Sequence, residues 1–247
     1  MDFSVNQNLL QKVDGIRKML AWSLLPARCL LCNEPGMGDI DLCQACWEAL
    51  PFNRQACSRC ALPMSAPAAA CAQCLKKTPA FFSTLAPMQY RASVSSLVPR
   101  FKFHQDLAAG RLLAEIFCRN SANFDIPDVL IPVPLHTARL RQRGFDQAFE
   151  LTKMMAKSKS IPMRTNLLYR QRHTRAQSDL DAMQRRKNCR GAFIASRKTM
   201  PSHIALIDDV MTTGTTVNEC AKVLLGAGAR RVDVWVLARV ATPGALA

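Results

Sequence analysis

One stretch, residues 204–216, constrains the fold more than any other part of the chain. It reads Ile-Ala-Leu-Ile-Asp-Asp-Val-Met-Thr-Thr-Gly-Thr-Thr. The apolar run at residues 204–207 predicts a strand that is buried on both faces, and two carboxylates, Asp208 and Asp209, follow it. Apolar residues then recur at helical spacing over residues 217–225. The stretch therefore predicts a strand, a polar turn and a helix in direct succession.

The polar turn combines the features of a phosphate site. Its residues are Thr212, Thr213, Gly214, Thr215 and Thr216. A turn that leads into a helix presents unpaired N–H groups and the positive end of the helix dipole, and both attract a phosphate. The hydroxyls add donors, and Gly214 lets the backbone approach a ligand closely. Asp208 and Asp209 suit a sugar diol, or a magnesium ion carried by the ligand. Phosphate and vicinal hydroxyls together describe a ribose 5-phosphate.

The whole string closely resembles the fingerprint of the type I phosphoribosyltransferases, which bind phosphoribosyl pyrophosphate (PRPP). This resemblance implies Mg²⁺ bound together with PRPP. The alternative is an ordinary strand, turn and helix whose turn happens to be polar. A lone pair of aspartates or a lone threonine-rich turn would favour that alternative, but the complete string favours the ligand site.

Cysteine spacing is the second informative pattern. Four Cys-x-x-Cys pairs follow one another at equal spacing: Cys29/Cys32, Cys43/Cys46, Cys57/Cys60 and Cys71/Cys74. Each pair supplies two thiolates, and zinc takes four in a tetrahedron, so the eight cysteines predict two structural Zn²⁺ ions. Large apolar residues are too few here for a separate core, so metal would supply much of the folding free energy. The equal spacing leaves two pairings open. Sequential pairing, which we favour, gives tandem zinc ribbons, and interleaved pairing gives a cross-braced module.

Two other uses of these cysteines fit less well. A disulfide-stapled secreted module is disfavoured because no signal peptide precedes the cysteines. A redox dithiol is disfavoured because four evenly spaced copies do not suit one catalytic pair. Clustered free thiolates indicate a reducing compartment, so we expect the protein in the cytoplasm.

Residues 1–28 predict an N-terminal amphipathic helix rather than a secretory signal, because charged residues interrupt the apolar positions. We expect this helix to pack on the folded body, with membrane association as the less favoured alternative. No apolar run in the sequence approaches membrane-spanning length, so no transmembrane segment is expected.

The net charge of +15 is concentrated in one part of the chain. Residues 91–247 hold 25 of the 33 basic residues and 12 of the 18 acidic ones. One anionic ligand does not require this excess, so it suggests a polyanionic partner, with nucleic acid the first candidate. A solvated basic surface is the alternative. The candidate nucleic-acid contacts are Arg170, Arg172, Arg175, Arg185, Arg186 and Lys187. Candidate stacking platforms are Phe101, Phe103, Phe145 and Tyr169, although each is favoured as a core residue.

Strands and helices alternate after the cysteine segment. We expect three parts: the helix at 1–28, a double zinc ribbon at 29–78 and a main domain at 79–247. Alternation favours an α/β fold, with a mostly parallel sheet flanked by helices and the phosphate turn at the carboxyl end of a strand. The main domain is expected to start with a linking strand or loop at 79–90 and to end with an alternating strand at 231–237 that closes the sheet. Between them we expect helices at 107–119, capped by Asp106, and at 144–157, strands at 129–131, 164–169 and 192–195, and a mobile basic flap at 170–190.

Taken together, the chain resembles the ComF family, bacterial proteins associated with natural competence. The matching stretches are the tandem Cys-x-x-Cys module, residues 131–136 leading to residues 143–145, residues 175–178 leading through 186–188 to 191–193, and residues 208–216. One departure is Asp146, where the family motif usually has Asn. The resemblance implies a phosphoribosyltransferase-like domain after the double zinc ribbon. It also implies PRPP binding and a cytoplasmic role in handling incoming single-stranded DNA during transformation.

The resemblance also implies roles for individual residues. Asp208 and Asp209 would be the catalytic pair that faces the ribose hydroxyls, and the polar turn would hold the 5-phosphate. The loop on the pyrophosphate side would be Pro132, Val133, Pro134 and Leu135. Further anion contacts would be Lys102, Arg139 and Arg143.

Three function classes remain open. The first, which we adopt, is a protein that binds PRPP and single-stranded DNA, with the zinc module contacting the strand or a protein such as a helicase. The second is an active phosphoribosyltransferase that transfers ribose 5-phosphate from PRPP to a nucleobase or an amine. The third is a non-catalytic PRPP sensor, in which ligand binding tunes the affinity for DNA or a partner.

Overall fold

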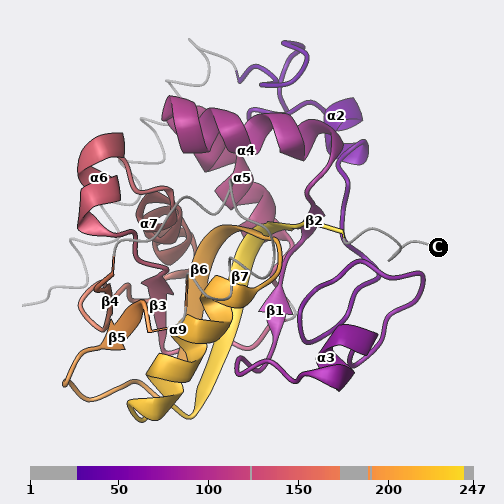
Figure 1. Ribbon diagram of the computed structural model, residues 1–247. Coiled ribbons are helices and arrows are strands. Elements are labelled where there is room, and N and C mark those ends of the chain that lie inside the picture. The colour runs from indigo at the N-terminus through magenta and orange to yellow at the C-terminus, as the bar shows by residue number, and fades with distance from the viewer. Residues whose placement is uncertain (1–26, 123, 173–188, 190, 242–247) are drawn as a thin grey trace, which may run out of the picture. The chain divides into compact units, whose positions relative to one another are not determined.

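A parallel sheet built around β6 (His203–Met211) and β7 (Arg231–Arg239) forms the centre of the larger part of the protein (Figure 1). The computed structural model describes residues 27–122, 124–172, 189 and 191–241, without the side chains of Arg139, Gln142 and Arg143. The other elements are α2 (Gln44–Glu48), α3 (Ala72–Lys76), β1 (Thr84–Leu85), β2 (Met88–Gln89), α4 (Ala92–His104), α5 (Leu107–Arg119), β3 (Val129–Pro132), α6 (Thr137–Arg143), α7 (Gln147–Lys159), β4 (Leu168–Arg170), β5 (Phe193–Ala195) and α9 (Thr215–Gly226).

The sheet has the strand order β1–β7–β6–β3, and all of its pairings are parallel. β2 also pairs with β7, four residues further along than β1, so β1 and β2 act as two pieces of one edge strand. Pro87 lies between the two pieces, and an edge strand tolerates a proline because one side of it forms no ladder. β4 and β5 form a separate antiparallel pair. The predicted α/β fold with a mostly parallel sheet is confirmed.

Helices cover both faces of this sheet. Val232, Val234 and Val236 belong to the same buried cluster as the apolar face of α9. The intervening Trp235 meets Phe117 of α5, with ring centroids 5.5 Å apart. Successive residues of a strand point to opposite faces, so α9 and α5 lie on opposite sides. None of the helices in the described ranges has both the length and the hydrophobicity of a membrane span.

The expected position of the last strand was wrong. We predicted that residues 231–237 form an alternating strand that closes the sheet, but β7 lies between β1/β2 and β6. Its residues 232–239 are all buried, including Asp233 and Trp235. The reason is that residues 84–89, read from the sequence as a linking strand or loop, pair along its outer edge while helices cover both faces.

Several element boundaries also differ from the prediction. The helix expected at 144–157 is α7, which begins only at Gln147, because Gly144 adopts a left-handed conformation (φ 64°) that ends α6 and Asp146 caps α7 by accepting a hydrogen bond from the amide of Phe149. Helix α6 was not expected. Helix α4 was not foreseen, whereas Asp106 caps α5 as expected. The N-terminal helix expected at 1–28 lies almost wholly outside the described residues, as does most of the flap expected at 170–190.

The eight cysteines form two clusters of four with sequential pairing. One cluster is Cys29, Cys32, Cys43 and Cys46, and the other is Cys57, Cys60, Cys71 and Cys74. In each cluster the four sulfur atoms lie within 4.8 Å of one another, and a tetrahedral zinc ion with ~2.3 Å Zn–S bonds requires similar separations. The two tetrads therefore support two structural Zn²⁺ ions, held by thiolates in the first and second ribbon respectively.

The two clusters belong to different compact units, which are residues 1–50 and residues 51–247. Within the larger unit, the cysteines of the second cluster share one buried core with residues of β3, β6, β7 and α9. Ala61, directly after the second cluster's first Cys-x-x-Cys pair, takes a left-handed conformation (φ 52°), and its amide donates to the Cys57 carbonyl. The second ribbon is therefore packed directly on the sheet that carries the polar turn.

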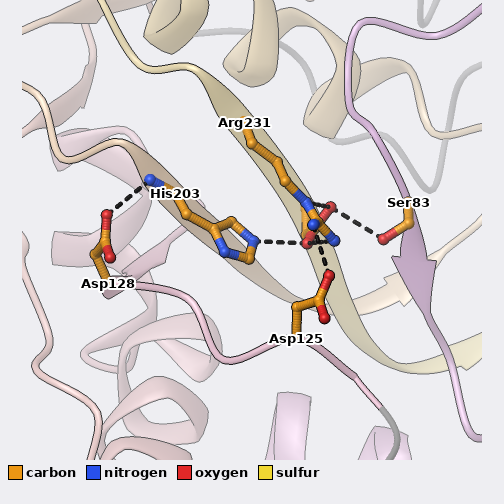
Figure 2. A network of polar contacts seen from close by, with 6 residues as sticks. Ser83, Asp125, Asp128, His203 and Arg231 are labelled. Atoms are coloured by element: carbon orange, nitrogen blue, oxygen red, sulfur yellow. Dashed lines mark hydrogen bonds and ion pairs between the residues drawn. The ribbon is translucent and has the colours of Figure 1, made fainter.

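A polar network around the buried Asp233 joins the amino ends of β6 and β7, opposite to the end that carries Asp208 (Figure 2). Asp233 accepts a hydrogen bond from Ser83 Oγ (2.9 Å), pairs with Arg231 (2.8 Å) and contacts His203 Nε2 (2.7 Å). Arg231 also pairs with Asp125 at 2.6 Å. Ser83 is bonded to the carboxylate and not to the imidazole, so these side chains do not form a nucleophilic Ser–His–Asp relay. The network stabilises the fold.

Replacing Asp233 with alanine is expected to lower the free energy of unfolding by about 2 kcal/mol, because it leaves Arg231 and His203 without a buried acceptor. Urea unfolding at pH 7 measures this change. The matched control is Ser83→Ala, which removes one hydrogen bond and should cost about 1 kcal/mol. Equal stability of the Asp233→Ala variant and the wild type would contradict the stabilising role of the network.

Candidate ligand site at the carboxyl end of the sheet

The polar turn follows β6 directly and forms the start of α9. Gly214 is the N-cap residue, with a left-handed conformation (φ 73°), and α9 begins at Thr215. The hydroxyls of Thr213 and Thr215 lie 2.8 Å apart, and the Thr215 amide donates to Thr213 Oγ1 at 3.4 Å. A glycine cap has no side chain to occupy the first-turn amides, so the turn presents the N–H groups and helix dipole that a phosphate requires.

The acidic pair lies within β6, and not after it as the apolar run suggested. Asp208 Oδ1 accepts a hydrogen bond from the amide of Asp209 (2.9 Å), and Asp209 Oδ1 accepts one from the amide of Val210 (2.8 Å). Lys102, in the last turn of α4, pairs with Asp209 at 2.6 Å. The structure therefore places Lys102, expected to contact an anion, beside one carboxylate of the acidic pair.

The two carboxyl groups have opposite pKa shifts. Burial, followed by the neighbouring charge of Asp209, raises the pKa of Asp208 to about 8. Burial also opposes ionisation of Asp209, but the ammonium group of Lys102 outweighs it and lowers the pKa of Asp209. Near neutral pH the pair therefore holds one proton, on Asp208. Such a pair can both donate hydrogen bonds to a diol and accept them from it.

A cavity of about 370 Å³ opens at this end of the sheet. The sequence-predicted residues in its lining are Lys102, Val133, Pro134, Leu135, Asp208, Asp209, Thr212 and Thr216. Thr213, Gly214 and Thr215 line a second cavity of about 410 Å³. Pro132 is the last residue of β3 and is buried outside both linings. The polar turn thus contributes residues to two cavities, and the first cavity also contains the acidic pair.

Three further residues of the first cavity were missed or assigned elsewhere from the sequence. They are Tyr90, Phe103 and Arg170. Tyr90 directly follows β2. Ligand residues gather at the carboxyl ends of parallel strands, so recognising β2 as a strand in the sequence would have identified Tyr90 as a candidate. Phe103 was considered only as a stacking platform for DNA bases, and it is exposed as that role requires. Phe101, in contrast, is buried and packs against Phe145 with ring centroids 5.4 Å apart.

Arg170 was predicted to contact nucleic acid, but its side chain lines the cavity that contains the acidic pair. Its guanidinium stacks over Phe193, 5.3 Å from the ring centroid. Burial lowers the pKa of Arg170, although an arginine stays charged at neutral pH. Arg172 is exposed. The other expected nucleic-acid contacts, Arg175, Arg185, Arg186 and Lys187, lie outside the described residues, as do the side chains of Arg139 and Arg143.

The chain matches one known domain family and is similar to several known proteins. Residues 20–75 match the double zinc ribbon domain family. The chain is 33% identical over 222 residues to the DNA utilization protein YhgH of Salmonella typhimurium, covering 87% of this chain and 98% of that protein. It is 32% identical over 225 residues to competence protein F of Haemophilus influenzae, covering 86% of this chain and 96% of that protein.

More distant similarities are weaker. Competence protein ComFC of Streptococcus pneumoniae is 29% identical over 150 residues, which is 61% of this chain and 65% of that protein. The glutamine PRPP amidotransferase of B. subtilis superimposes with a TM-score of 0.34 at 20% identity, over 58% of this chain and 26% of that chain. That superposition is too weak to bear on the ligand. The double zinc ribbon, and the identity of 33% and 32% over most of the chain to YhgH and competence protein F, together show that the chain belongs to the ComF family.

Proposed function

We propose that this protein binds PRPP with Mg²⁺ at the first cavity and binds single-stranded DNA, and that it acts in the cytoplasm to aid DNA uptake in natural transformation. The names of its relatives, a DNA utilization protein and competence protein F, support the role in DNA uptake. One observation carries the ligand assignment: Thr212 and Thr216, on either side of the glycine-capped helix start, line the same cavity as an acidic pair that holds one proton. A sugar phosphate with a free diol fits this combination.

The residues around the cavity suggest how the parts of PRPP would be held. The amides and hydroxyls of the polar turn would bind the 5-phosphate, and Asp208 and Asp209 would bind the ribose hydroxyls. Arg170 supplies a fixed positive charge in the same wall for the pyrophosphate. Mg²⁺ would enter with the pyrophosphate and neutralise part of its charge. Calorimetric titration with PRPP and Mg²⁺ tests this assignment, and the absence of binding heat and of any stabilisation against unfolding would contradict it.

For DNA binding we expect a steep dependence on salt, because contacts to phosphates release counterions. A triple alanine variant at Arg185, Arg186 and Lys187 should weaken binding to every strand sequence. It should also reduce the slope of log K against log salt by about 2, at roughly 0.7 per contact. Fluorescence anisotropy with a labelled oligonucleotide measures both quantities. A control triple variant at Lys153, Lys157 and Lys159 removes the same charge from α7, which was not predicted to contact nucleic acid, and an equal change of slope there would indicate a non-specific charge effect.

Phosphoribosyl transfer is a second candidate, favoured by the apolar wall that Tyr90 and Phe103 add to the cavity. An acceptor nitrogen held there would attack the anomeric carbon of PRPP. The bond from that carbon to pyrophosphate would break, and pyrophosphate would leave with the electron pair. The cavity residues would act by positioning and by electrostatic stabilisation. Release of pyrophosphate with a panel of nucleobases and amines tests this candidate. Release no faster than from a Gly214→Val variant would reject it and leave PRPP as a bound regulator of DNA affinity.

A further inference from the structure

Arg239 joins the second zinc ribbon to the polar turn. It is the last residue of β7, and its side chain is only 2% exposed. Its Nε donates to the carbonyl of Cys60 at 2.9 Å, and its Nη1 donates to the carbonyls of Met211 (3.1 Å) and Thr212. A further bond reaches the carbonyl of Val240 at 2.6 Å. One buried guanidinium thus holds a zinc ligand residue and the first part of the phosphate turn at the same time.

A buried arginine needs compensating negative charge, and the second cysteine cluster supplies it. Burial lowers the pKa of Arg239, and the nearby thiolates of Cys60, Cys71 and Cys74 oppose this effect. A zinc ion bound by four thiolates keeps a net negative charge, so the metal-loaded cluster remains a counterion for the guanidinium. The site fits zinc, since four thiol sulfur atoms lie within 4.8 Å of one another.

These hydrogen bonds determine how the turn faces its ligand. In a trans peptide the carbonyl and the next N–H group point in opposite directions within one plane. Binding of the Met211 and Thr212 carbonyls by Arg239 therefore orients the N–H groups of Thr212 and Thr213 away from Arg239. The amide of Val240 also donates to the Met211 carbonyl at 3.0 Å, so two consecutive residues, Arg239 and Val240, hold the same carbonyl.

Direct packing between the ribbon and the turn is incomplete. The cavity of about 410 Å³ is lined by Cys60 and Cys74 from the ribbon and by Thr213 and Gly214 from the turn, and Arg239 also forms part of its wall. A displacement of the second ribbon would be transmitted to the polar turn through Arg239, because its planar guanidinium donates hydrogen bonds both to Cys60 in the ribbon and to Met211 and Thr212 at the turn.

We propose that Arg239 is a positioning residue that makes the affinity of the turn for PRPP depend on the second zinc cluster and not on the first. The inference rests on the proposed PRPP site. It assigns different roles to two similar clusters: the cluster at Cys57–Cys74 shares a compact unit with the polar turn and supports the ligand site, whereas the cluster at Cys29–Cys46 belongs to the other compact unit.

The first experiment compares PRPP affinity in zinc-loaded, full-length variants. Arg239→Met removes the donors but keeps the length of the side chain, and we expect a loss of affinity of roughly tenfold or more, within the usual range of coupling between two sites. Arg239→Lys keeps a charge but cannot bond both sides as a fork, so it should recover only part of the affinity. The control Arg119→Met removes an arginine that pairs with Glu115 on the exposed side of α5, and it should bind PRPP like the wild type.

The second experiment uses the wild-type protein, so it does not depend on the folding of a variant. Coupling is reciprocal, so PRPP with Mg²⁺ must stabilise the second cluster as much as that cluster stabilises PRPP binding. With a chelator that is selective for zinc over magnesium, alkylation of each cysteine followed by mass spectrometry reports the opening of each cluster. PRPP should slow alkylation of Cys57, Cys60, Cys71 and Cys74 by roughly tenfold and leave Cys29, Cys32, Cys43 and Cys46 unchanged.

The outcomes separate the two claims. If the wild-type protein does not bind PRPP, the proposed function fails and this inference fails with it. If it binds PRPP but neither cluster is protected, or both clusters are protected equally, the inference alone is overturned. Undiminished affinity in a folded Arg239→Met variant with full zinc content would also overturn it. Selective protection that disappears in Arg239→Met would support it, because a purely structural arginine would not make protection depend on the ligand.

Discussion

Replacing Gly214 with valine is expected to weaken PRPP binding by about 100-fold, and replacing it with alanine by about tenfold. Gly214 has φ of +73°, where an L-residue costs roughly 1–2 kcal/mol and a β-branched residue costs more. A Cβ there would also lie 2.4 Å from the terminal methyl group of Met211, a buried side chain that would have to move within the core. The turn would rearrange to relieve this strain, and its amides would no longer converge on the phosphate.

Calorimetry with PRPP and Mg²⁺ measures the loss. The matched control is Gly226→Ala at the other end of α9, where a Cβ would meet no atom within 4 Å and no left-handed conformation is required. This control should bind PRPP like the wild type and gain some stability, because alanine favours the helix by up to about 1 kcal/mol. Wild-type affinity in the Gly214→Val variant would contradict the phosphate assignment of the turn.

Neighbouring substitutions in the acidic pair are expected to change stability in opposite directions. Asp208 has a pKa of about 8 in the folded protein, above its value in the unfolded chain. From about pH 4 to pH 8 the folded state therefore binds more protons than the unfolded state, and stability falls as pH rises through this window. Asp208→Asn removes that dependence, so the variant should match the wild type near pH 3. It should be more stable by about 3 kcal/mol at pH 9, since the amide retains part of the cost of burial.

Asp209 behaves in the opposite way because Lys102 lowers its pKa. Its contribution to stability is fully present above the pKa of the unfolded chain, near pH 4, and is lost as pH falls through the lower folded value. Asp209→Asn should therefore destabilise the protein by about 2 kcal/mol at neutral pH, where it leaves Lys102 without its carboxylate at 2.6 Å. The deficit should shrink in acid.

Urea unfolding of both variants between pH 3 and pH 9 tests this pair of predictions, and each variant serves as the control for the other. Both variants should bind PRPP more weakly. Asp208→Asn would therefore raise stability and lower ligand affinity, a trade-off that is common at ligand-site residues. Two variants that change stability in the same direction at pH 8, or by an amount that does not vary with pH, would contradict the proposed charge distribution in the pair.

Structural features that depend on residues close together in the sequence could be predicted from the sequence. Each Cys-x-x-Cys pair is a local turn, so the sequence alone specified the thiolates, and the structure added only that the pairs combine sequentially. The order of strand, polar turn and helix at residues 203–226 follows from local periodicity and from Gly214. The parallel sheet follows from the alternation of elements.

Features that join distant segments were decided by the tertiary structure alone. The sequence gives no sign that Lys102 pairs with Asp209, or that Arg170 lines the ligand cavity and not a DNA surface. Arg239 and Cys60 are 179 residues apart, and they meet because β7 lies inside the sheet beside the second ribbon. Local propensity acts over a few residues, whereas these contacts depend on which strands are neighbours. The sequence by itself therefore determined what kinds of groups the protein has, and only the packing of the sheet decided which charge faces which partner.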